Sequence, residues 1–406
     1  MQSSRSLRVW VFASLLTSVW CRAAFGACGD PPGAAAQPAS GPAVPTSAAS
    51  GEEESSLTRL LRQTLKRRHV PAVAAAVVRS SGVVDAAAVG VRKVRSKKAV
   101  TVDDCFHLGS CTKSMTASMC AMLVEQGKLK WETTIADAWP DLSAKLDEGF
   151  REVTLEQLLC HRSGLPEDRR PDPAIWPKVV GLTGPLPQQR LAVVELVMGR
   201  EPAYPPGSRF EYANFGVTVA GAMAEAATGE AYESIMRRLL FDPLGMKSAG
   251  FGAPGDAGEV NEPRGHSSLL GLYSSVAPGT GADNPPVIAP AGTAHMSITD
   301  WAKYAAWHLR GARGEARLIS RATFDRIHHD PFGNQYGFGW VVTNREGVRG
   351  PVIAHDGSNG MWYAVIWLAP EEDVGFVVAV NAGDDDAAEA CRAVLASLIR
   401  RHIPPR

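Results

Sequence analysis

A serine and a lysine three residues apart, Ser110 and Lys113, are the pair in this sequence best suited to covalent chemistry. They open a stretch, 112–124, in which nearly every position is small or apolar, as is typical of a buried helix. Residues three apart share one helical face, so the two side chains project together. A lysine in so dry a site can lose its proton and deprotonate the serine, which makes the serine an activated nucleophile.

The pair also has a purely structural interpretation. About one Ser-x-x-Lys match is expected by chance in a chain of this length. Ser110 could cap the helix, and Lys113 could extend its ammonium group to solvent. The sequence holds no second match, however, and the partners that an acyl-transfer site needs follow downstream. We therefore interpret Ser110 as a nucleophile and Lys113 as its base.

Tyr212 and Asn214 stand two residues apart at the predicted junction between a loop and the helix 216–228. The phenol of Tyr212 would carry protons to the leaving group. The amide of Asn214 would bind a substrate carbonyl or steady Lys113. A core tyrosine beside a capping asparagine is the alternative interpretation of this pair.

A predicted strand near the C-terminal end would form the opposite wall. It ends in His355-Asp356-Gly357-Ser358, and alternation along the strand directs His355 and Gly357 to one side and Asp356 to the other. The missing side chain of Gly357 would let a substrate lie against the strand. The backbone N–H groups of Ser358 and Ser110 would then form an oxyanion hole.

Together these motifs resemble those of the serine β-lactamase and penicillin-binding-protein superfamily, closest to its class C type. The resemblance covers about 52–401. It implies that Ser110 forms an acyl-enzyme and that Lys113 and Tyr212 are its acid–base groups. It also implies that Asn214 binds a substrate amide and that the strand carrying His355 is the oxyanion wall.

The third motif departs from the Lys-Thr-Gly of that superfamily, in which the lysine and threonine bind the carboxylate of penicillins and D-alanyl peptides. His355 is only partly charged near neutral pH, and Asp356 adds a negative charge. We therefore expect a small ester, amide or peptide substrate without that carboxylate. A true β-lactamase or D-alanyl-D-alanine carboxypeptidase is one alternative, and a catalytically silent cell-wall-binding or scaffold relative is another.

The bulk composition narrows the class of protein. The chain has 406 residues, 42 basic and 42 acidic, so nothing favours a nucleic-acid partner. Its 7 cysteines have no paired spacing, which is unlike a disulfide framework or a zinc site. Its 10 histidines are scattered without ligand spacing, so we expect no metal and no cofactor.

The first 27 residues are typical of a signal peptide, with Arg5 and Arg8, an apolar run at 9–20 and small residues after it. We therefore expect export, to the periplasm, to the cell envelope as a lipoprotein, or into the medium. Phe25-Gly26-Ala27-Cys28 also resembles a lipoprotein cleavage box, in which a lipid on Cys28 would tether the chain to a membrane. Residues 28–51 are rich in Pro, Ala, Gly and Ser, which predicts a flexible linker.

Two groups of predicted strands frame these catalytic residues. Short apolar runs between turn residues predict strands at 72–78, 83–91, 336–343, 352–355, 362–368 and 375–380. Helical spacing predicts helices at 52–69, 216–228, 231–240, 298–309 and 387–401. The stretches 169–189 and 250–291 are predicted to be loops, and His107-Leu108-Gly109 to be the turn that leads into the nucleophile helix.

We therefore predict an α+β fold for the hydrolase domain, residues 52–406. Its antiparallel five-stranded sheet is flanked by the N- and C-terminal helices, and a second lobe is mostly helical. The sheet lobe takes 52–105 and 330–402, and the helical lobe takes 106–329. A cleft between the two lobes would hold the site.

Overall fold

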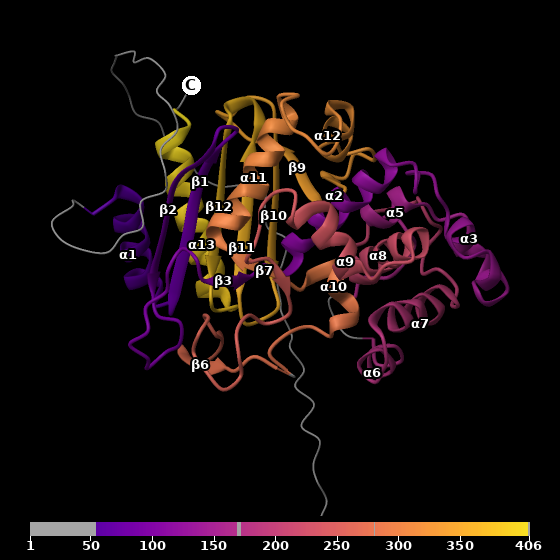
Figure 1. Ribbon diagram of the computed structural model, residues 1–406, viewed down its shortest axis with the longest axis horizontal. Coiled ribbons are helices and arrows are strands. Elements are labelled where there is room, and N and C mark those ends of the chain that lie inside the picture. The colour runs from indigo at the N-terminus through magenta and orange to yellow at the C-terminus, as the bar shows by residue number, and fades with distance from the viewer. Residues whose placement is uncertain (1–53, 169–171, 280, 405–406) are drawn as a thin grey trace, which may run out of the picture. The chain divides into compact units, whose positions relative to one another are not determined.

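The computed structural model describes residues 54–168, 172–279 and 281–404 (Figure 1). The predicted signal peptide, the predicted linker and the lipid attachment at Cys28 lie outside the described residues. Within the described ranges, no helix combines the length and the apolar character that crossing a bilayer requires.

One antiparallel sheet of seven strands organises the chain, in the order β2-β1-β12-β11-β10-β9-β8 (Figure 1). Its strands are β1 (Ala72–Arg79), β2 (Gly82–Gly90), β8 (Tyr336–Gly337), β9 (Trp340–Asn344), β10 (Pro351–Ser358), β11 (Tyr363–Ala369) and β12 (Val374–Val380). β1 pairs with β12, so strands from the two ends of the domain are neighbours in the sheet. This pairing is the arrangement that the two groups of predicted strands required.

The sheet has seven strands, two more than the predicted five-stranded sheet and one more than the six predicted strand segments. The stretch 336–343 divides at Phe338 and Gly339, whose φ angles of 51° and 79° turn the chain. The resulting short strands β8 and β9 pair with each other, and β9 extends the sheet beside β10. Because so tight a hairpin contains no polar loop, the sequence pattern of 336–343 is that of a single strand.

Helices cover both faces of the sheet. α1 (Ser56–Arg68) and α13 (Asp385–His402) pack their apolar stripes on one face, in a cluster that includes Leu61, Val365 and Leu398. α11 (Ile298–Ala312) packs on the other face, as Figure 1 shows. Because both faces are covered, β1, β11 and β12 are nearly continuous apolar runs.

The middle of the chain is mostly helical, around the buried helix α2 (Thr112–Glu125). The other α-helices here are α3 (Ile135–Ala138), α4 (Glu148–Arg151), α5 (Leu155–Leu159), α6 (Trp176–Val180), α7 (Leu186–Met198), α8 (Asn214–Thr228), α9 (Tyr232–Met236), α10 (Ala289–Gly292) and α12 (Arg321–Ile327). Short segments of other helix types are η1 (Gly109–Cys111), η2 (Pro140–Lys145), η3 (Arg237–Phe241), η4 (Pro286–Ile288) and, between β11 and β12, η5 (Pro370–Glu372). The boundaries predicted between a sheet lobe and a helical lobe stay a prediction.

Both predicted loop regions contain regular structure. The stretch 169–189 includes α6 and the start of α7, which begins with Pro187 in its first turn, a position that proline tolerates. The stretch 250–291 includes β4 (Gly250–Phe251) and the hairpin of β5 (Gly265–Leu269) and β6 (Leu272–Val276). β4 and β3 (Cys105–His107) flank β7 (Ala294–Ser297) in a three-stranded sheet beside the nucleophile turn.

Candidate active site

Ser110 and Lys113 meet at the junction of η1 and α2, as the spacing predicts. Gly109 has a φ angle of 50°, and this left-handed turn directs the chain into α2 with Ser110 half-buried. Lys113 is fully buried, and its Nζ lies 3.0 Å from Ser110 Oγ. Thr112 Oγ1 donates a hydrogen bond to the Gly109 carbonyl at 2.7 Å and braces the turn.

Two further oxygens hold the amine of Lys113. Nζ lies 2.7 Å from Asn214 Oδ1 and 2.7 Å from the Ala291 carbonyl oxygen. These two oxygens can only accept, whereas the Ser110 hydroxyl can donate or accept. A neutral amine therefore fits the same positions, donating to Asn214 and Ala291 and accepting the hydroxyl proton of Ser110.

Tyr212 lies against this amine. Lys113 Nζ is 4.8 Å from the centre of the Tyr212 ring, and the tilted His161 ring packs on the same tyrosine with 4.3 Å between the ring centres. His161 Nδ1 accepts the Ala213 N–H at 3.2 Å, and its carbonyl accepts the Glu211 N–H at 2.8 Å. His161 thus fixes the segment around Tyr212. The sequence analysis did not predict this role, because His161 lies far from Tyr212 in the sequence.

Asn214 is the first residue of α8, and both ends of its amide are engaged. Its Oδ1 accepts from Lys113, and its Nδ2 donates to Asp168 Oδ1 at 2.9 Å. The structure thus shows the steadying of Lys113, one of the two predicted roles. Binding of a substrate carbonyl by Asn214 stays a prediction.

Asp168 is a site residue that sequence reasoning missed. Its carboxylate also accepts the backbone N–H groups of Asn214 and Phe215, at 2.8 and 2.7 Å, and so caps the start of α8. Burial raises the pKa of the Asp168 carboxyl, and these hydrogen bonds and the nearby Lys113 oppose the shift. The only sequence signal is an acidic residue just after Gly164-Leu165-Pro166.

β10 lies directly against the nucleophile turn, and Gly357 permits the contact. A Cβ atom on Gly357 would stand 2.2 Å from the Leu108 carbonyl oxygen and 2.5 Å from the Ser110 nitrogen. A Cβ on Gly109 would stand 2.4 Å from the Ser358 nitrogen. The prediction that Gly357 makes room for substrate was therefore wrong, because the turn itself fills that space. The same contact brings the Ser110 and Ser358 backbones together.

His355 is buried rather than presented to the groove. Its Nδ1 donates to the Asp356 carbonyl at 2.5 Å, since a carbonyl only accepts, and its Nε2 lies 3.1 Å from the Tyr336 hydroxyl. A neutral imidazole satisfies both contacts.

Asp356 faces the opposite side of the sheet. Its Oδ2 accepts a hydrogen bond from the Tyr363 hydroxyl at 2.5 Å, and Tyr363 belongs to the cluster beneath α1 and α13. The alternation along β10 is as predicted. The inference that the Asp356 charge weakens the attraction for an anionic substrate stays a prediction.

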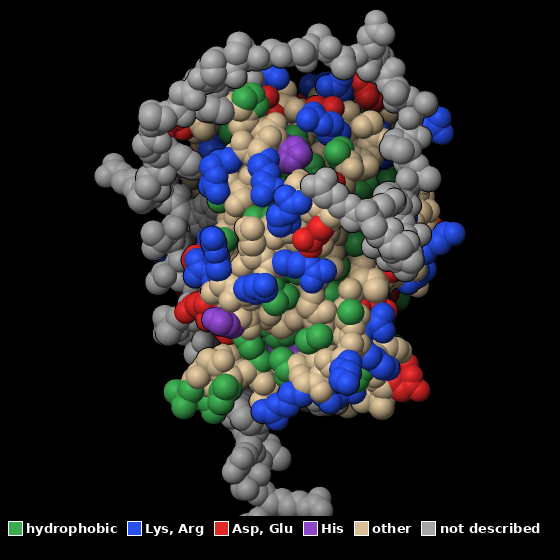
Figure 2. Space-filling view, turned by 90° about the vertical axis from the view of Figure 1, so that its left-hand side faces the viewer, with side chains coloured by type: hydrophobic (Ala, Val, Ile, Leu, Met, Phe, Trp, Pro, Cys, Tyr) green, Lys and Arg blue, Asp and Glu red, His purple; other side chains and the backbone are tan. Residues whose placement is uncertain are grey.

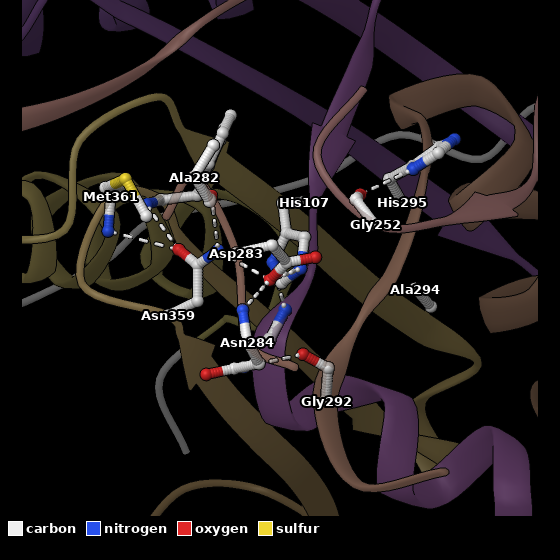
Figure 3. Close-up of polar contacts among 12 residues, drawn as sticks. His107, Gly252, Ala282, Asp283, Asn284, Gly292, Ala294, His295, Asn359 and Met361 are labelled. Carbon is white, nitrogen blue, oxygen red and sulfur yellow. Dashed lines mark hydrogen bonds and ion pairs between the residues drawn. The ribbon is translucent and has the colours of Figure 1, made fainter. Parts of the chain in front are cut away.

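A second network supports the nucleophile turn from β3. His107 Nδ1 accepts the Gly109 N–H at 3.1 Å, and His107 Nε2 lies 2.8 Å from Asp283 Oδ1. Figure 3 shows Asp283 between His107 and Asn359, whose Nδ2 donates to the same oxygen at 2.9 Å. The predicted turn therefore begins one residue later than expected, because His107 is the last residue of β3 and pairs with His295 of β7. The network also includes Asp283, from a predicted loop.

Comparisons with known proteins show which proteins this chain is similar to. A family model described as Beta-lactamase matches residues 57–399. Penicillin-binding protein 4 of Amycolatopsis lactamdurans is 27% identical over 326 residues, which cover 78% of this chain and 82% of that protein. Unguisins hydrolase ungD' of Aspergillus campestris is 28% identical over 344 residues, which cover 80% of this chain and 60% of the hydrolase.

Solved structures share the architecture. The octameric penicillin-binding protein homologue from Pyrococcus abyssi has a TM-score of 0.68 at 24% identity, covering 86% of this chain and 78% of its own. The crystal structure of SurE with D-Leu has a TM-score of 0.67 at 22% identity, covering 85% of this chain and 74% of its own. At these identities the likeness shows the fold.

Proposed function

The chain belongs to the Beta-lactamase family of serine hydrolases, and on that premise we propose that it is a hydrolase of the class C type. It forms an acyl-enzyme on Ser110 and hydrolyses small esters or non-anionic amides. The observation that carries the choice of substrate is the burial of His355. The strand position that holds a lysine in the superfamily holds here an imidazole whose two nitrogens are turned to Asp356 and Tyr336.

The first step follows from the contacts of Lys113. The amine accepts the hydroxyl proton of Ser110 as Oγ attacks the carbonyl carbon of the substrate. Asn214 Oδ1 and the Ala291 carbonyl then accept two of the three N–H groups of the ammonium, which stabilises the charged form. Burial opposes that charge, so the amine can return the proton.

Tyr212 completes the proton path. Its ring lies beside Lys113 Nζ, so we assign its hydroxyl to transfer the proton to the leaving group. The tilted packing of His161 holds the ring. Water then attacks the acyl group, and the same bases act in reverse to release Ser110.

The tetrahedral oxygen requires two aligned donors. The backbones of Ser110 and Ser358 are in contact through Gly109 and Gly357, and we assign their N–H groups to the oxyanion hole. A Cβ on either glycine would separate the two segments, so this pair of donors depends on both glycines.

The substrate class follows from the charges on β10. His355 turns both ring nitrogens to Asp356 and Tyr336, so β10 offers a substrate carboxylate no lysine, and the carboxylate of Asp356 is committed to Tyr363. Small esters and neutral amides do not need a cation at this position. A substrate carboxylate would lose its hydration there without gaining an ion pair, which weakens its binding.

A D-alanyl peptidase or β-lactamase is the second candidate. The relative named penicillin-binding protein 4 supports it, because the alignment covers most of both chains. The silent scaffold is less well supported, since a binding protein has no use for a buried lysine 3.0 Å from a serine hydroxyl.

A matched substrate panel tests the proposal. We expect kcat/KM for p-nitrophenyl acetate and butyrate to exceed that for penicillins and cephalosporins. We expect a D-alanyl-D-alanine peptide to be turned over at least about tenfold more slowly than the same peptide with a C-terminal amide. Faster turnover of the free acids, or of β-lactams, would establish the second candidate. A folded protein that no fluorophosphonate labels would establish the scaffold.

We also propose that the chain is exported. The support is the sequence pattern of its first 28 residues, which precedes the described domain. The mass of the mature N-terminus tests this: cleavage after Ala27 with a lipid on Cys28 would establish a lipoprotein, and an uncleaved Met1 would contradict export.

A further inference from the structure

The tip of the β5–β6 hairpin is unusually apolar for a surface turn. Leu269, Leu270 and Leu272 are 76%, 95% and 73% exposed, which makes them the most exposed large apolar side chains of the described residues. Scattered single leucines need no explanation, but three on one narrow turn form a protruding apolar group.

The backbone conformation at this tip is also unfavourable for leucine. Leu270 and Gly271 have φ angles of 52° and 76°, the combination of a two-residue hairpin turn that favours asparagine and glycine. A leucine in the left-handed region is strained, and this one also gains no burial. Neither the turn nor the core therefore explains why leucine stands at 270.

A basic turn lies beside the hairpin. The Val94 N–H donates to His266 Nε2 of β5 at 3.1 Å, and the Arg264 N–H donates to the Arg92 carbonyl at 2.8 Å. This turn, 92–98, contains Lys93, Arg95, Lys97 and Lys98, of which the last three are exposed. A cavity of about 560 Å³ separates it from β6, and Lys93 and Arg95 line that cavity together with Tyr273, Ser274 and Ser275.

The same side of the molecule is basic over a wider area. Figure 2 faces the side on which α1 lies and shows lysine and arginine side chains spread over it, with a small apolar group at its lower edge. α1 supplies the exposed side chains of Arg59, Arg62, Lys66 and Arg67. Two nearby acidic groups are engaged, since Asp104 pairs with Arg92 and Asp384 accepts from the Tyr273 hydroxyl at 3.0 Å, whereas Asp385 and Asp386 are exposed.

We propose that this hairpin tip inserts into an anionic lipid surface, with the cations of the 92–98 turn against the lipid headgroups. Exposed leucines beside lysines are the combination that binds membrane interfaces. A protein partner is disfavoured, because a two-residue tip cannot bury the roughly 1,000 Å² of a stable interface and lysine is depleted in such interfaces. The contact is separate from any lipid on Cys28 and from the chemistry at Ser110.

Vesicle binding of the full-length chain tests the proposal, with vesicles of phosphatidylcholine alone or with about one third phosphatidylglycerol. The decisive variant is Leu270→Asn, because asparagine relieves the strained turn and removes the apolar side chain. We expect its Tm to equal or exceed that of the wild type, while binding to the anionic vesicles falls at least about fivefold. Leu270→Ser/Leu272→Ser and Lys97→Glu/Lys98→Glu should each reduce that binding at least about tenfold.

α6 supplies the matched controls. Val180 is 56% exposed and Lys178 is exposed on the same helix, so Val180→Ser and Lys178→Glu should bind vesicles like the wild type. Hydrogen exchange measures protection of the hairpin tip separately from that of other segments. Anionic vesicles should slow exchange of the backbone amides in 268–273 and leave those of α6 unchanged.

Two results would overturn the proposal. One is unchanged vesicle binding in the leucine variants, together with unchanged exchange at the tip. The other is a wild-type dimer in sedimentation velocity that Leu270→Ser/Leu272→Ser abolishes without an effect on vesicle binding, which would make the tip a contact between two copies.

Discussion

The carboxylate of Asp283 lies 2.8 Å from Nε2 of His107, and His107 Nδ1 accepts the N–H of Gly109, the residue before Ser110. Asp283 also accepts from Asn359, next to the Ser358 that we assign to the oxyanion hole. One half-buried acid thus connects the nucleophile turn with the end of β10. It touches no reacting atom, so we regard it as a positioning residue.

Loss of Asp283 should therefore affect catalysis more than binding. We expect Asp283→Ala to lower kcat about 10- to 100-fold with KM nearly unchanged, because a turn displaced by a fraction of an ångström misaligns Ser110. Asp283→Asn keeps an oxygen for Asn359 and should recover part of kcat. Steady-state kinetics beside Asp256→Ala, a change on an exposed loop, checks this; a loss of thermal stability with unchanged kcat would contradict it.

Replacing Lys113 should stop acylation. We expect Lys113→Met to lower the acylation rate at least about 10³-fold, since no other group takes the Ser110 proton. Lys113→Arg should be equally inactive, because a guanidinium stays protonated and cannot act as a base. Stopped-flow release of p-nitrophenol measures this step. An arginine variant with more than about a tenth of the wild-type rate would exclude the base role.

Tyr212→Phe separates the hydroxyl of Tyr212 from its ring. The phenylalanine keeps the packing against His161 and Lys113, so we expect the free energy of unfolding to change by less than about 1 kcal/mol. We expect kcat to fall about 10²- to 10⁴-fold, because the leaving group loses its proton donor. Tyr273→Phe, which removes a phenol on the hairpin, is the matched control and should keep full activity.

Acid should destabilise the fold through its buried histidines. Burial lowers the pKa of His266 to about 4, while its unfolded value is near 6.5. A lowered pKa contributes stability that is present above pH 6.5 and is lost as the pH falls toward 4, because the unfolded chain binds the proton more readily. The contribution is on the order of 3 kcal/mol.

His266→Gln should therefore flatten the pH dependence of stability. Urea unfolding at several pH values between 7.5 and 4.5 measures the slope. The exposed His329→Gln should leave the slope as in the wild type. An unchanged slope in His266→Gln would show that other groups set the acid sensitivity.

Local patterns predicted much of the fold. The strands β1, β11 and β12 and the helices α8, α11 and α13 follow from apolar spacing and turn residues, with ends close to those predicted. The predicted strand 352–355 is shorter than β10, and the predicted helix 52–69 is longer than α1. The pattern failed where side chains did not alternate. The serine-rich β5–β6 hairpin shows no apolar face, and the split of β8 from β9 depends on a backbone turn rather than on composition.

The residues of the candidate site likewise fall into those that local spacing predicts and those that it does not. Ser110 and Lys113 share one helical turn, so their contact was predictable from spacing. Asp168 and Asp283 lie in loops and reach their partners across long stretches of chain, which no local pattern encodes. Gly357 was identified, but its purpose was not, because a close backbone contact is visible only once β10 and η1 are placed together.

The central claim is that Ser110 carries the acyl group. Intact-mass measurement of the protein, quenched in acid during turnover of p-nitrophenyl butyrate, tests it most directly. We predict one added acyl group, located by peptide mapping on Ser110 and absent from Ser110→Ala, with Tyr212→Phe accumulating it more slowly. An adduct on another residue, or ester turnover by Ser110→Ala at the wild-type rate, would contradict the account.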